Sequence, residues 1–144
     1  MKNSFKYIFL LLIIATTGGG CSKTDDPIIS SQIDQAFIQD ITLLDASAKD
    51  VVVSKSIPKI VVDIASGNER LDVAGTPLNI TVTAKTGTDL SNLFIRCILT
   101  GQSKFAKVSP EMGYYTSFST PKTYTVTSQT GKNISVYTLK VVLQ

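Results

Sequence analysis

The chain has 144 residues and contains neither histidine nor tryptophan. Without histidine it lacks the usual base for a serine or cysteine nucleophile, and it lacks a common zinc ligand. Its formal net charge of +3 is small and its basic residues form no cluster, so we expect no nucleic-acid partner.

The first 20 residues have the pattern of a cleaved signal peptide. Lys2 and Lys6 precede or flank an unbroken apolar run over residues 7–15. A transmembrane helix needs about 20 apolar residues, so this run fits an export signal better than a membrane span. An uncleaved membrane anchor is the alternative. Removal of residues 1–20 would leave 12 basic and 11 acidic side chains, a net charge of +1.

Cys21 directly follows three glycines, residues 18–20. Small residues before a cysteine resemble a bacterial lipobox, in which the thiol is diacylated and the cysteine becomes the first residue. Gly18 stands where a lipobox usually has leucine. The acyl chains would anchor the protein stably in a membrane. The alternative is a secretory signal with Cys21 in a disulfide. The other cysteine, Cys97, lies in an apolar strand-like run, so we expect no disulfide.

Residues 22–32 are polar, include a proline and predict a flexible tether. Asp25 and Asp26 resemble the acidic surface-export signal of lipoproteins from Bacteroidetes, although a plain solvated tether would also explain them. We therefore expect a lipid-anchored protein of the outer membrane, exposed on the cell surface. The predicted organisation is a signal peptide over residues 1–20, a lipidated cysteine and tether over 21–32, and one domain over 33–144.

From residue 33 onward, apolar and polar residues alternate with the period of β-strands. The predicted strands cover residues 37–44, 50–54, 59–64, 78–85, 93–100, 104–110, 122–129 and 135–143. Phe37, Ile41 and Leu43 are expected on one face of the first, and residues 93–100 form a largely buried strand. Residues 65–77 read as turns. Gly87 and Gly131 each end a "TVT" strand and are expected at turns with positive φ. Short strands with one apolar face predict an all-β, antiparallel β-sandwich, with a small barrel as the alternative.

The second half of the chain carries an ordered set of motifs. They are "TDL" at 88–90, Leu93, Thr100, Pro110 with Gly113, "FS" at 118–119, Pro121, "YTVT" at 124–127, Gly131 and "YTLKV" at 137–141. This order resembles an immunoglobulin-like domain of unknown function found in surface lipoproteins of Bacteroidetes. Ser117 and Thr130 replace the aspartates usual in that family, and the likeness is loose over residues 33–75. The resemblance implies an immunoglobulin-like sandwich in the company of glycan-binding and carbohydrate-processing proteins.

Most of the shared residues have a structural explanation. Tyr124 and Tyr137 are expected to pack in the core, and Asp89 is expected to close its loop. Phe118 is expected to plug one end of the sandwich. Cys97 is expected to be buried and unreactive.

The sequence argues against an enzyme. Asp89 and Glu111 are the one imaginable carboxylate pair of a glycosidase, and their spacing does not support that role. No calcium-binding loop or phosphate-binding glycine pattern is present in the sequence. We therefore expect no catalytic residue, no metal site and no cofactor.

One segment is a candidate for ligand contact. "SPEMGYYTSF", residues 109–118, places Met112, Tyr114 and Tyr115 in a turn-rich stretch. Exposed aromatic residues there could stack on sugar rings or contact a protein partner. The alternative is a loop folded back onto the sandwich.

Two functions are compatible with these patterns. The first is a non-enzymatic, lipid-anchored surface module that assists glycan binding or the assembly of an envelope complex. Its partners would be the membrane, through the N-terminal lipid, and a polysaccharide or another envelope protein. The second is a structural or adhesive subunit, fimbria-like or scaffolding, with protein partners only. A donor-strand mechanism in such a subunit would need a long unpaired strand edge.

Overall fold

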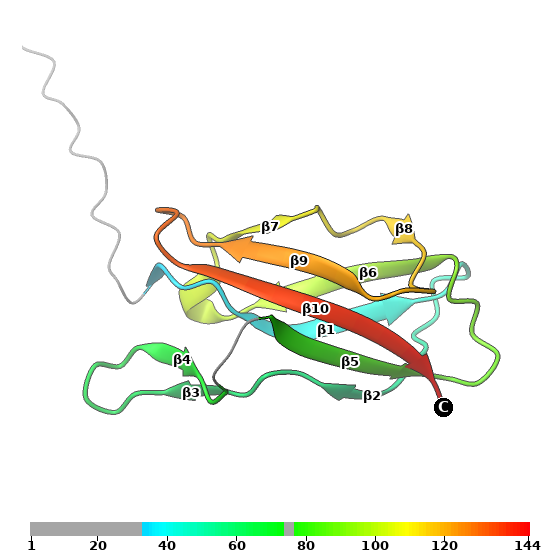
Figure 1. The fold of residues 1–144 in the computed structure, drawn as a ribbon, viewed down its shortest axis with the longest axis horizontal. Helices are drawn as coiled ribbons and strands as arrows, with labels where there is room; N and C mark the ends of the chain where they lie inside the picture. Colours follow the sequence, from blue (N-terminus) through cyan, green and yellow to red (C-terminus); the bar gives the residue numbers. More distant parts are fainter. Residues whose placement is uncertain (1–32, 74–76) are drawn as a thin grey trace, which may run out of the picture.

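The computed structural model describes residues 33–73 and 77–144, which form an all-β sandwich (Figure 1). The predicted signal peptide, Cys21 and the tether lie outside the described residues. Within the described ranges, no helix is long and apolar enough to cross a membrane. The strands are β1 (Ile38–Leu44), β2 (Val52–Ser56), β3 (Ile60–Val62), β4 (Glu69–Leu71), β5 (Leu78–Ala84), β6 (Leu93–Leu99), β7 (Lys107–Ser109), β8 (Tyr115–Thr116), β9 (Lys122–Thr127) and β10 (Ile134–Leu143).

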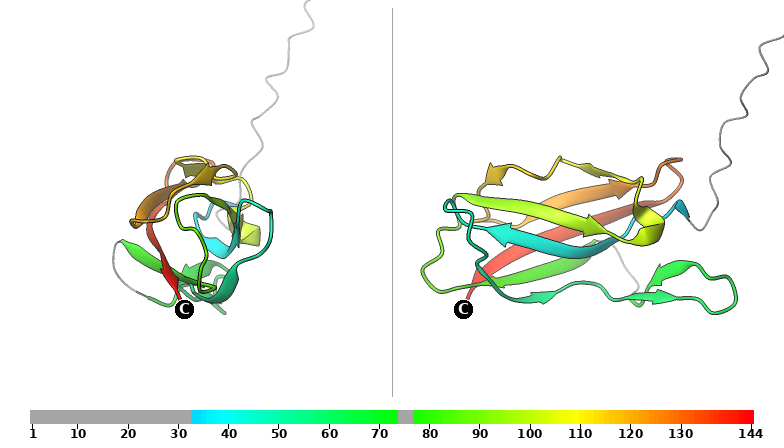
Figure 2. Two further views of the ribbon diagram at one scale, coloured as in Figure 1. Left: turned by 90° about the vertical axis from the view of Figure 1, so that its right-hand side faces the viewer. Right: turned by 180° about the vertical axis from the view of Figure 1, so that it is seen from behind.

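The strands form two facing sheets and a separate hairpin. One sheet has the order β1-β6-β8, the other has the order β2-β5-β10-β9-β7, and β3 pairs with β4 alone. Figure 2 shows the two layers and the β3–β4 hairpin, which projects beyond one end of the sandwich. The predicted sandwich is confirmed, because the strands form separate facing sheets and not the single closed barrel of the alternative prediction. The immunoglobulin-like assignment of this sandwich stays a prediction.

The five-stranded sheet is mixed rather than purely antiparallel. β10 runs parallel to β5, with Leu139 beside Ile80, and antiparallel to β9. The chain leaves β5, crosses to the other sheet through β6 and returns before β10. A parallel pair needs such a long crossover, whereas a hairpin joins only antiparallel strands. The antiparallel prediction therefore holds for every ladder in the described residues except this one.

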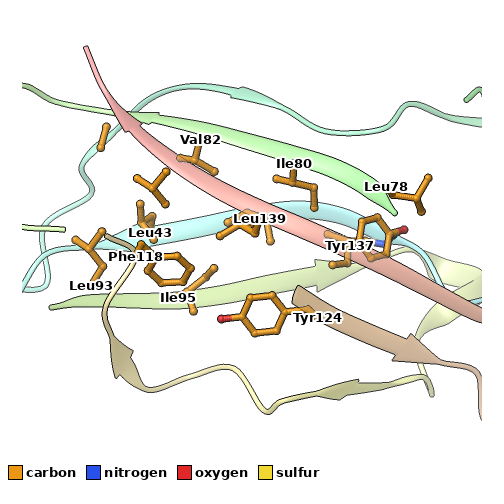
Figure 3. Packing of buried hydrophobic residues seen from close by; sticks show 14 of the residues in the cluster. Leu43, Leu78, Ile80, Val82, Leu93, Ile95, Phe118, Tyr124, Tyr137 and Leu139 are labelled. Carbon is orange, nitrogen blue, oxygen red and sulfur yellow. Dashed lines mark hydrogen bonds between the residues drawn. The ribbon is translucent and has the colours of Figure 1, made fainter. Parts of the chain in front are cut away.

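The core lies between the two sheets and is built from the alternate positions of their strands (Figure 3). On β5 the inward residues are Leu78, Ile80, Val82 and Ala84, all buried, as their alternation predicts. Full burial of one such aliphatic side chain contributes about 1.5–3 kcal/mol. Buried residues of β9 and β10 in the same sheet and of β1 and β6 in the opposing sheet complete the cluster, and they include Tyr124, Val126, Tyr137, Leu139, Ile41, Leu43, Leu93 and Ile95.

β1 departs from the predicted alternation. Phe37 is only half-buried, whereas Ile38 is buried together with Ile41 and Leu43. The pairing of β1 with β6 shifts register between Ile38 and Asp40. Such a bulge inserts an extra residue and reverses which parity faces the core. The prediction that Phe37 shares the buried face with Ile41 and Leu43 is therefore wrong, and Ile38 lies in the core instead.

The turn-rich segment 65–77 contains a strand that alternation did not reveal. β4 pairs with β3 through Val62 and Glu69. The Asp63 carboxylate accepts hydrogen bonds from the backbone N–H groups of Ala65, at 3.0 Å, and Ser66, at 2.9 Å. These bonds hold the turn between the two strands. The predicted turn at Gly131 has the expected positive φ of 76°.

The structural roles expected for several motif residues are confirmed. Tyr124 and Tyr137 are buried, and Phe118 is 1% exposed near the end of the core that carries Leu43 and Leu93 (Figure 3). The Asp89 carboxylate accepts a hydrogen bond from the backbone N–H of Ser91 at 2.9 Å and so closes its loop. Hydrogen bonds from the side chain and from the backbone N–H of Ser91 hold the pKa of Asp89 below its ordinary value.

Candidate functional site

The predicted contact segment follows β7 and leads into β8 at the edge of the three-stranded sheet. The backbone N–H of Gly113 donates to the carbonyl of Ile95 at 2.8 Å, which docks the segment on β6. Met112 is half-buried and packs against the core, whereas Tyr114 is 63% and Tyr115 46% exposed. The three candidates are therefore divided. Met112 folds back onto the sandwich, as the alternative prediction had it, whereas Tyr114 and Tyr115 are accessible to solvent.

Tyr115 belongs to an apolar row that crosses all three strands of its sheet. It lies opposite Phe94 of β6, which in turn lies opposite Leu44 of β1. Because Leu93 and Ile95 are buried, Phe94 lies on the outer face of the sheet. The rings of Phe94 and Tyr115 are 5.6 Å apart at 60°, a tilted arrangement that aromatic pairs favour. We call Leu44, Phe94 and Tyr115 the aromatic row.

The tyrosines differ in what surrounds them. The Tyr115 hydroxyl reaches the carbonyl of Asp45 at 3.4 Å, across the row. The Tyr114 hydroxyl reaches the Glu111 carboxylate at 3.4 Å, within its own loop. Both distances are long for hydrogen bonds between oxygens, so they hold the rings weakly. Tyr115 is positioned mainly by β8 and by Phe94.

Polar residues adjoin the aromatic row on the same face. The outward positions of β6 after Phe94 are Arg96 and Ile98, which pair with Thr42 and Asp40 of β1. Arg96 is exposed and Ile98 is 48% exposed. In the described part of the chain no strand covers this face (Figure 2). It offers aromatic surface beside hydrogen-bond donors, which suits a ligand that is apolar on one side and polar at its rim.

Asp40 does not act as a free carboxylate on this face. The ammonium of Lys55, on β2, donates to the Asp40 carboxylate and to the carbonyl of Ile41 at 3.1 Å. Partial burial alone would raise the pKa of Asp40. The hydrogen bonds from Lys55 and from the Ile41 N–H outweigh it and lower that pKa. This ion pair joins the edge strands of the two sheets.

Cys97 lies behind the contact segment rather than on the outer face. It lines a cavity of about 300 Å³ together with Val108, Met112 and other residues of β6 and the loop. Cys97 is a half-buried free cysteine, less buried than expected. Burial raises the pKa of its thiol, so the thiolate nucleophile is scarce at neutral pH. Among the described residues, no group of three or more His, Cys, Asp or Glu side chains could hold a metal ion.

The sequence missed the partners of Tyr115. Residues 93–100 were expected to be largely buried, but Phe94, Arg96 and Ile98 lie on the open face of β6. The alternation in "LFIRCIL" could have indicated this open face, because an unpaired Arg96 cannot face a dry core. The pairing of Phe94 with Tyr115 has no such signal, since the two residues are joined only by the register of β6 and β8.

Comparisons with known proteins found one matching family model and similar solved structures. A family model described as "SGBP, N-terminal" matches residues 60–141, more than half of the chain. A Bacteroides thetaiotaomicron structure, provisionally described as a glycoside hydrolase, is 26% identical over 65% of this chain, with a TM-score of 0.42. The match spans only 24% of that protein's length. A Bacteroides fragilis structure, provisionally described as a secreted protein, is 17% identical over 78% of this chain and 98% of its own, with a TM-score of 0.46. No match was found among curated proteins. By the extent of the family match, the chain belongs to the SGBP, N-terminal family, a glycan-binding family.

Proposed function

We propose that this protein is a non-catalytic, lipid-anchored module of the outer-membrane surface that binds a glycan on the outer face of its three-stranded sheet. The observation that carries the proposal is the aromatic row, in which exposed Tyr115 packs on half-buried Phe94 on a face that no described strand covers. Membership of a glycan-binding family supports the choice of ligand. The pattern around Cys21 supports the lipid anchor.

The geometry of the row suits a sugar ring. The apolar face of a pyranose can lie against an aromatic ring, while its hydroxyls reach donors at the edge of that ring. Tyr115 and Phe94 restrict each other's motion, so little side-chain freedom is lost when a ligand binds. Arg96 and Thr42 lie on the next pair of positions and can meet the hydroxyls.

The second candidate function is a structural or adhesive subunit with protein partners only. The β3–β4 hairpin favours it, because Val62 is 59% exposed and Ile64, at the hairpin turn, is fully exposed. Projecting apolar side chains of this kind often mark protein contacts. Such a subunit would assemble with other envelope proteins and would show no affinity for polysaccharide.

Affinity electrophoresis in gels containing polysaccharides separates the two functions. We expect retardation of the chain in at least one polysaccharide gel. Replacement of Tyr115 or Phe94 by alanine should weaken it about two- to tenfold, because an aromatic contact contributes about 0.5–1.5 kcal/mol. Phe105→Ala is the matched control, since Phe105 is 49% exposed but belongs to the segment before β7. Equal losses in all three variants would refute the placement of the site, and no retardation in any gel would refute glycan binding.

The lipid anchor needs a test of its own. Cells that express the full chain should incorporate labelled palmitate into it and retain it in the outer-membrane fraction. Cys21→Ala should abolish both, whereas Cys97→Ala should change neither, because Cys97 lies in the domain. Incorporation that persists in Cys21→Ala, or that is absent from the unaltered chain, would overturn the anchor.

A further inference from the structure

One end of the domain brings together the start of the described chain, the turn after β6, the turn between β9 and β10, and the β3–β4 hairpin (Figures 1 and 2). The Asp34 carboxylate accepts hydrogen bonds from the hydroxyl of Thr130 and from its backbone N–H, the latter at 3.0 Å. The backbone N–H of Gln35 donates to the carbonyl of Gln102 at 3.0 Å. The predicted tether therefore joins the domain here. We call residues 33–35, 63–68, 101–107 and 128–134 the tether end.

The β3–β4 hairpin is held to this end by the side chain of Gln102. Its amide oxygen accepts a hydrogen bond from the backbone N–H of Glu69, and its amide nitrogen donates to the carbonyl of Gly67, both at 2.8 Å. The half-buried amide thus uses both of its ends, so the hairpin turn projects from the sandwich in a defined direction (Figure 2). A surface that is ordered before it binds loses less conformational freedom on binding.

Exposed apolar side chains gather at the tether end. Ile64, in the hairpin turn, is fully exposed, Ile134, the first residue of β10, is 60% exposed, and Phe105, after the turn that follows β6, is 49% exposed. Ile134 pairs with Thr127 of β9, which in turn pairs with Lys107 of β7. Apolar side chains that are exposed together and rimmed by polar residues mark contact surfaces.

Basic side chains lie among these apolar ones. Lys104, Lys107 and Lys132 are all exposed. The Lys104 ammonium lies 4.8 Å from the centre of the Phe105 ring, so a cation and an aromatic ring are presented side by side. Asp34, the only acidic residue in the three sandwich segments of this end, is buried. The hairpin adds charges of both signs, which nearly cancel, and they belong to Lys59, Arg70, Asp63, Glu69 and Asp72.

The tether would keep this end close to the membrane. Residues 22–32 separate Cys21 from the first described residue, and a chain of that length spans at most about 40 Å when fully extended. An acyl anchor on Cys21 would therefore hold the tether end within reach of the lipid. Two sites joined by a short linker meet at a high effective concentration, so even a weak contact is then sufficient.

We propose that the tether end docks on an anionic lipid surface, with Ile64 and Phe105 entering the headgroup layer and the three lysines contacting lipid phosphates. This inference rests on the proposed function, because the lipid on Cys21 supplies the proximity. A protein partner is the alternative occupant of an apolar surface. Lipid is favoured because the tether brings this end, and not another, to the membrane.

Docking at this end would set the orientation of the proposed glycan-binding face. β8, which carries Tyr115, lies near the opposite end of the domain (Figure 1). The aromatic row also lies on the side of the sandwich, on the outer face of β6 and β8. It would therefore stay uncovered, at a distance from the lipid, while the tether end is docked.

The test uses tryptophan as a fluorescent probe, because the chain contains none. The full chain with its lipid is purified as Ile64→Trp or as Ser47→Trp and is inserted into vesicles of phosphatidylcholine and phosphatidylglycerol in equal parts. Ser47→Trp is the control, since Ser47 is exposed in the turn that follows β1, at the opposite end (Figure 1). We expect the emission of Ile64→Trp to shift to shorter wavelength and to be quenched by brominated lipid. The emission of Ser47→Trp should do neither.

Removal of single charges gives a second measurement. Lys104→Gln or Lys132→Gln, each added to Ile64→Trp, should lower the ratio of docked to undocked protein about fivefold, which is the contribution of one lysine near an anionic surface. Lys49→Gln is the control, because exposed Lys49 lies in the same turn as Ser47, and it should leave the ratio unchanged. Vesicles of phosphatidylcholine alone should quench Ile64→Trp less.

The outcomes separate the docking from the proposed function. Quenching of neither tryptophan, or equal quenching of both, would overturn the docking, and so would equal effects of Lys104→Gln and Lys49→Gln. Retardation in polysaccharide gels and incorporation of palmitate would be unaffected by such a result, so the proposed function would stand. A chain that incorporates no palmitate in cells would overturn the anchor and the docking together.

Discussion

Replacement of Tyr137 by phenylalanine should destabilise the protein through a single backbone group. The Tyr137 hydroxyl, carried by β10, accepts a hydrogen bond from the backbone N–H of Ile38 at 3.1 Å. Ile38 lies on β1, in the opposite sheet, and both residues are at most 1% exposed. The bond therefore crosses the core, beside the position where the pairing of β1 shifts register. Phenylalanine would leave that N–H buried without an acceptor.

The expected loss follows from the cost of an unsatisfied buried donor. That cost is about 1–3 kcal/mol, and the phenyl ring keeps nearly all of the apolar contacts. For a domain of this size the change corresponds to a fall in melting temperature of about 4–12 °C. Urea unfolding followed by far-UV circular dichroism suits a chain without tryptophan. The midpoint should fall while the denaturant slope stays unchanged.

Tyr124→Phe is the matched control for this prediction. Tyr124 is buried on β9, and no hydrogen bond to its hydroxyl is found among the described residues. Burial raises the pKa of both tyrosines. For Tyr137 the hydrogen bond from Ile38 opposes that effect, whereas no hydrogen bond opposes it for Tyr124. We expect a change below about 0.5 kcal/mol for Tyr124→Phe. Equal effects of the two variants, or a negligible effect of Tyr137→Phe, would refute the reasoning.

Three further predictions concern a turn, an ion pair and the thiol. Gly131→Ala should lower the free energy of unfolding by about 1 kcal/mol or more, because φ is +76° at that position. Gly101→Ala is the control and should change it little, since neither a positive φ nor a close contact restricts that position. Chemical denaturation measures both variants. Asp40→Asn should cost at most about 1 kcal/mol at pH 7, because its ion pair with Lys55 is partly exposed. The pKa of Asp40 is lowered in the folded protein, so the stabilisation by the ion pair is complete above about pH 4 and is lost as the pH falls through the folded pKa. Urea titrations of the unaltered chain and of Asp40→Asn should therefore show a smaller difference in stability at pH 3 than at pH 7. Cys97 should react with a disulfide reagent at pH 8 more slowly in the folded protein than in urea, because burial raises the pKa of its thiol, and equal rates would contradict that reasoning.

The fold class could be predicted because the two central strands each bury one face. β5 and β10 alternate without interruption, so their inward residues and their approximate bounds follow from the sequence. The parallel pairing of these two strands does not follow, because it depends on where the chain crosses between sheets. The bulge in β1 is likewise hidden, because a single inserted residue changes the parity of a strand without changing its composition.

The candidate sites could be predicted only in part. The turn-rich composition around Tyr114 and Tyr115 left open whether their loop is exposed or folded back, and the structure shows the two tyrosines exposed and Met112 turned inward. The docking of the β3–β4 hairpin on the sandwich left no signal in the sequence. It requires Gln102 to bond Glu69 across 33 positions of sequence, and a glutamine in a polar turn looks like any solvated residue.

The two faces of β6 explain why residues of the proposed glycan-binding face could be replaced without loss of stability. Leu93 and Ile95 are buried, so packing restricts what can stand at those positions. Phe94 and Arg96 alternate with them on the outer face, where packing sets few limits. The ladder hydrogen bonds are made by the backbone and hold the outer side chains in register whatever they are. If the proposed site is right, substitutions at the outer positions should alter ligand preference while the sandwich that carries them stays the same.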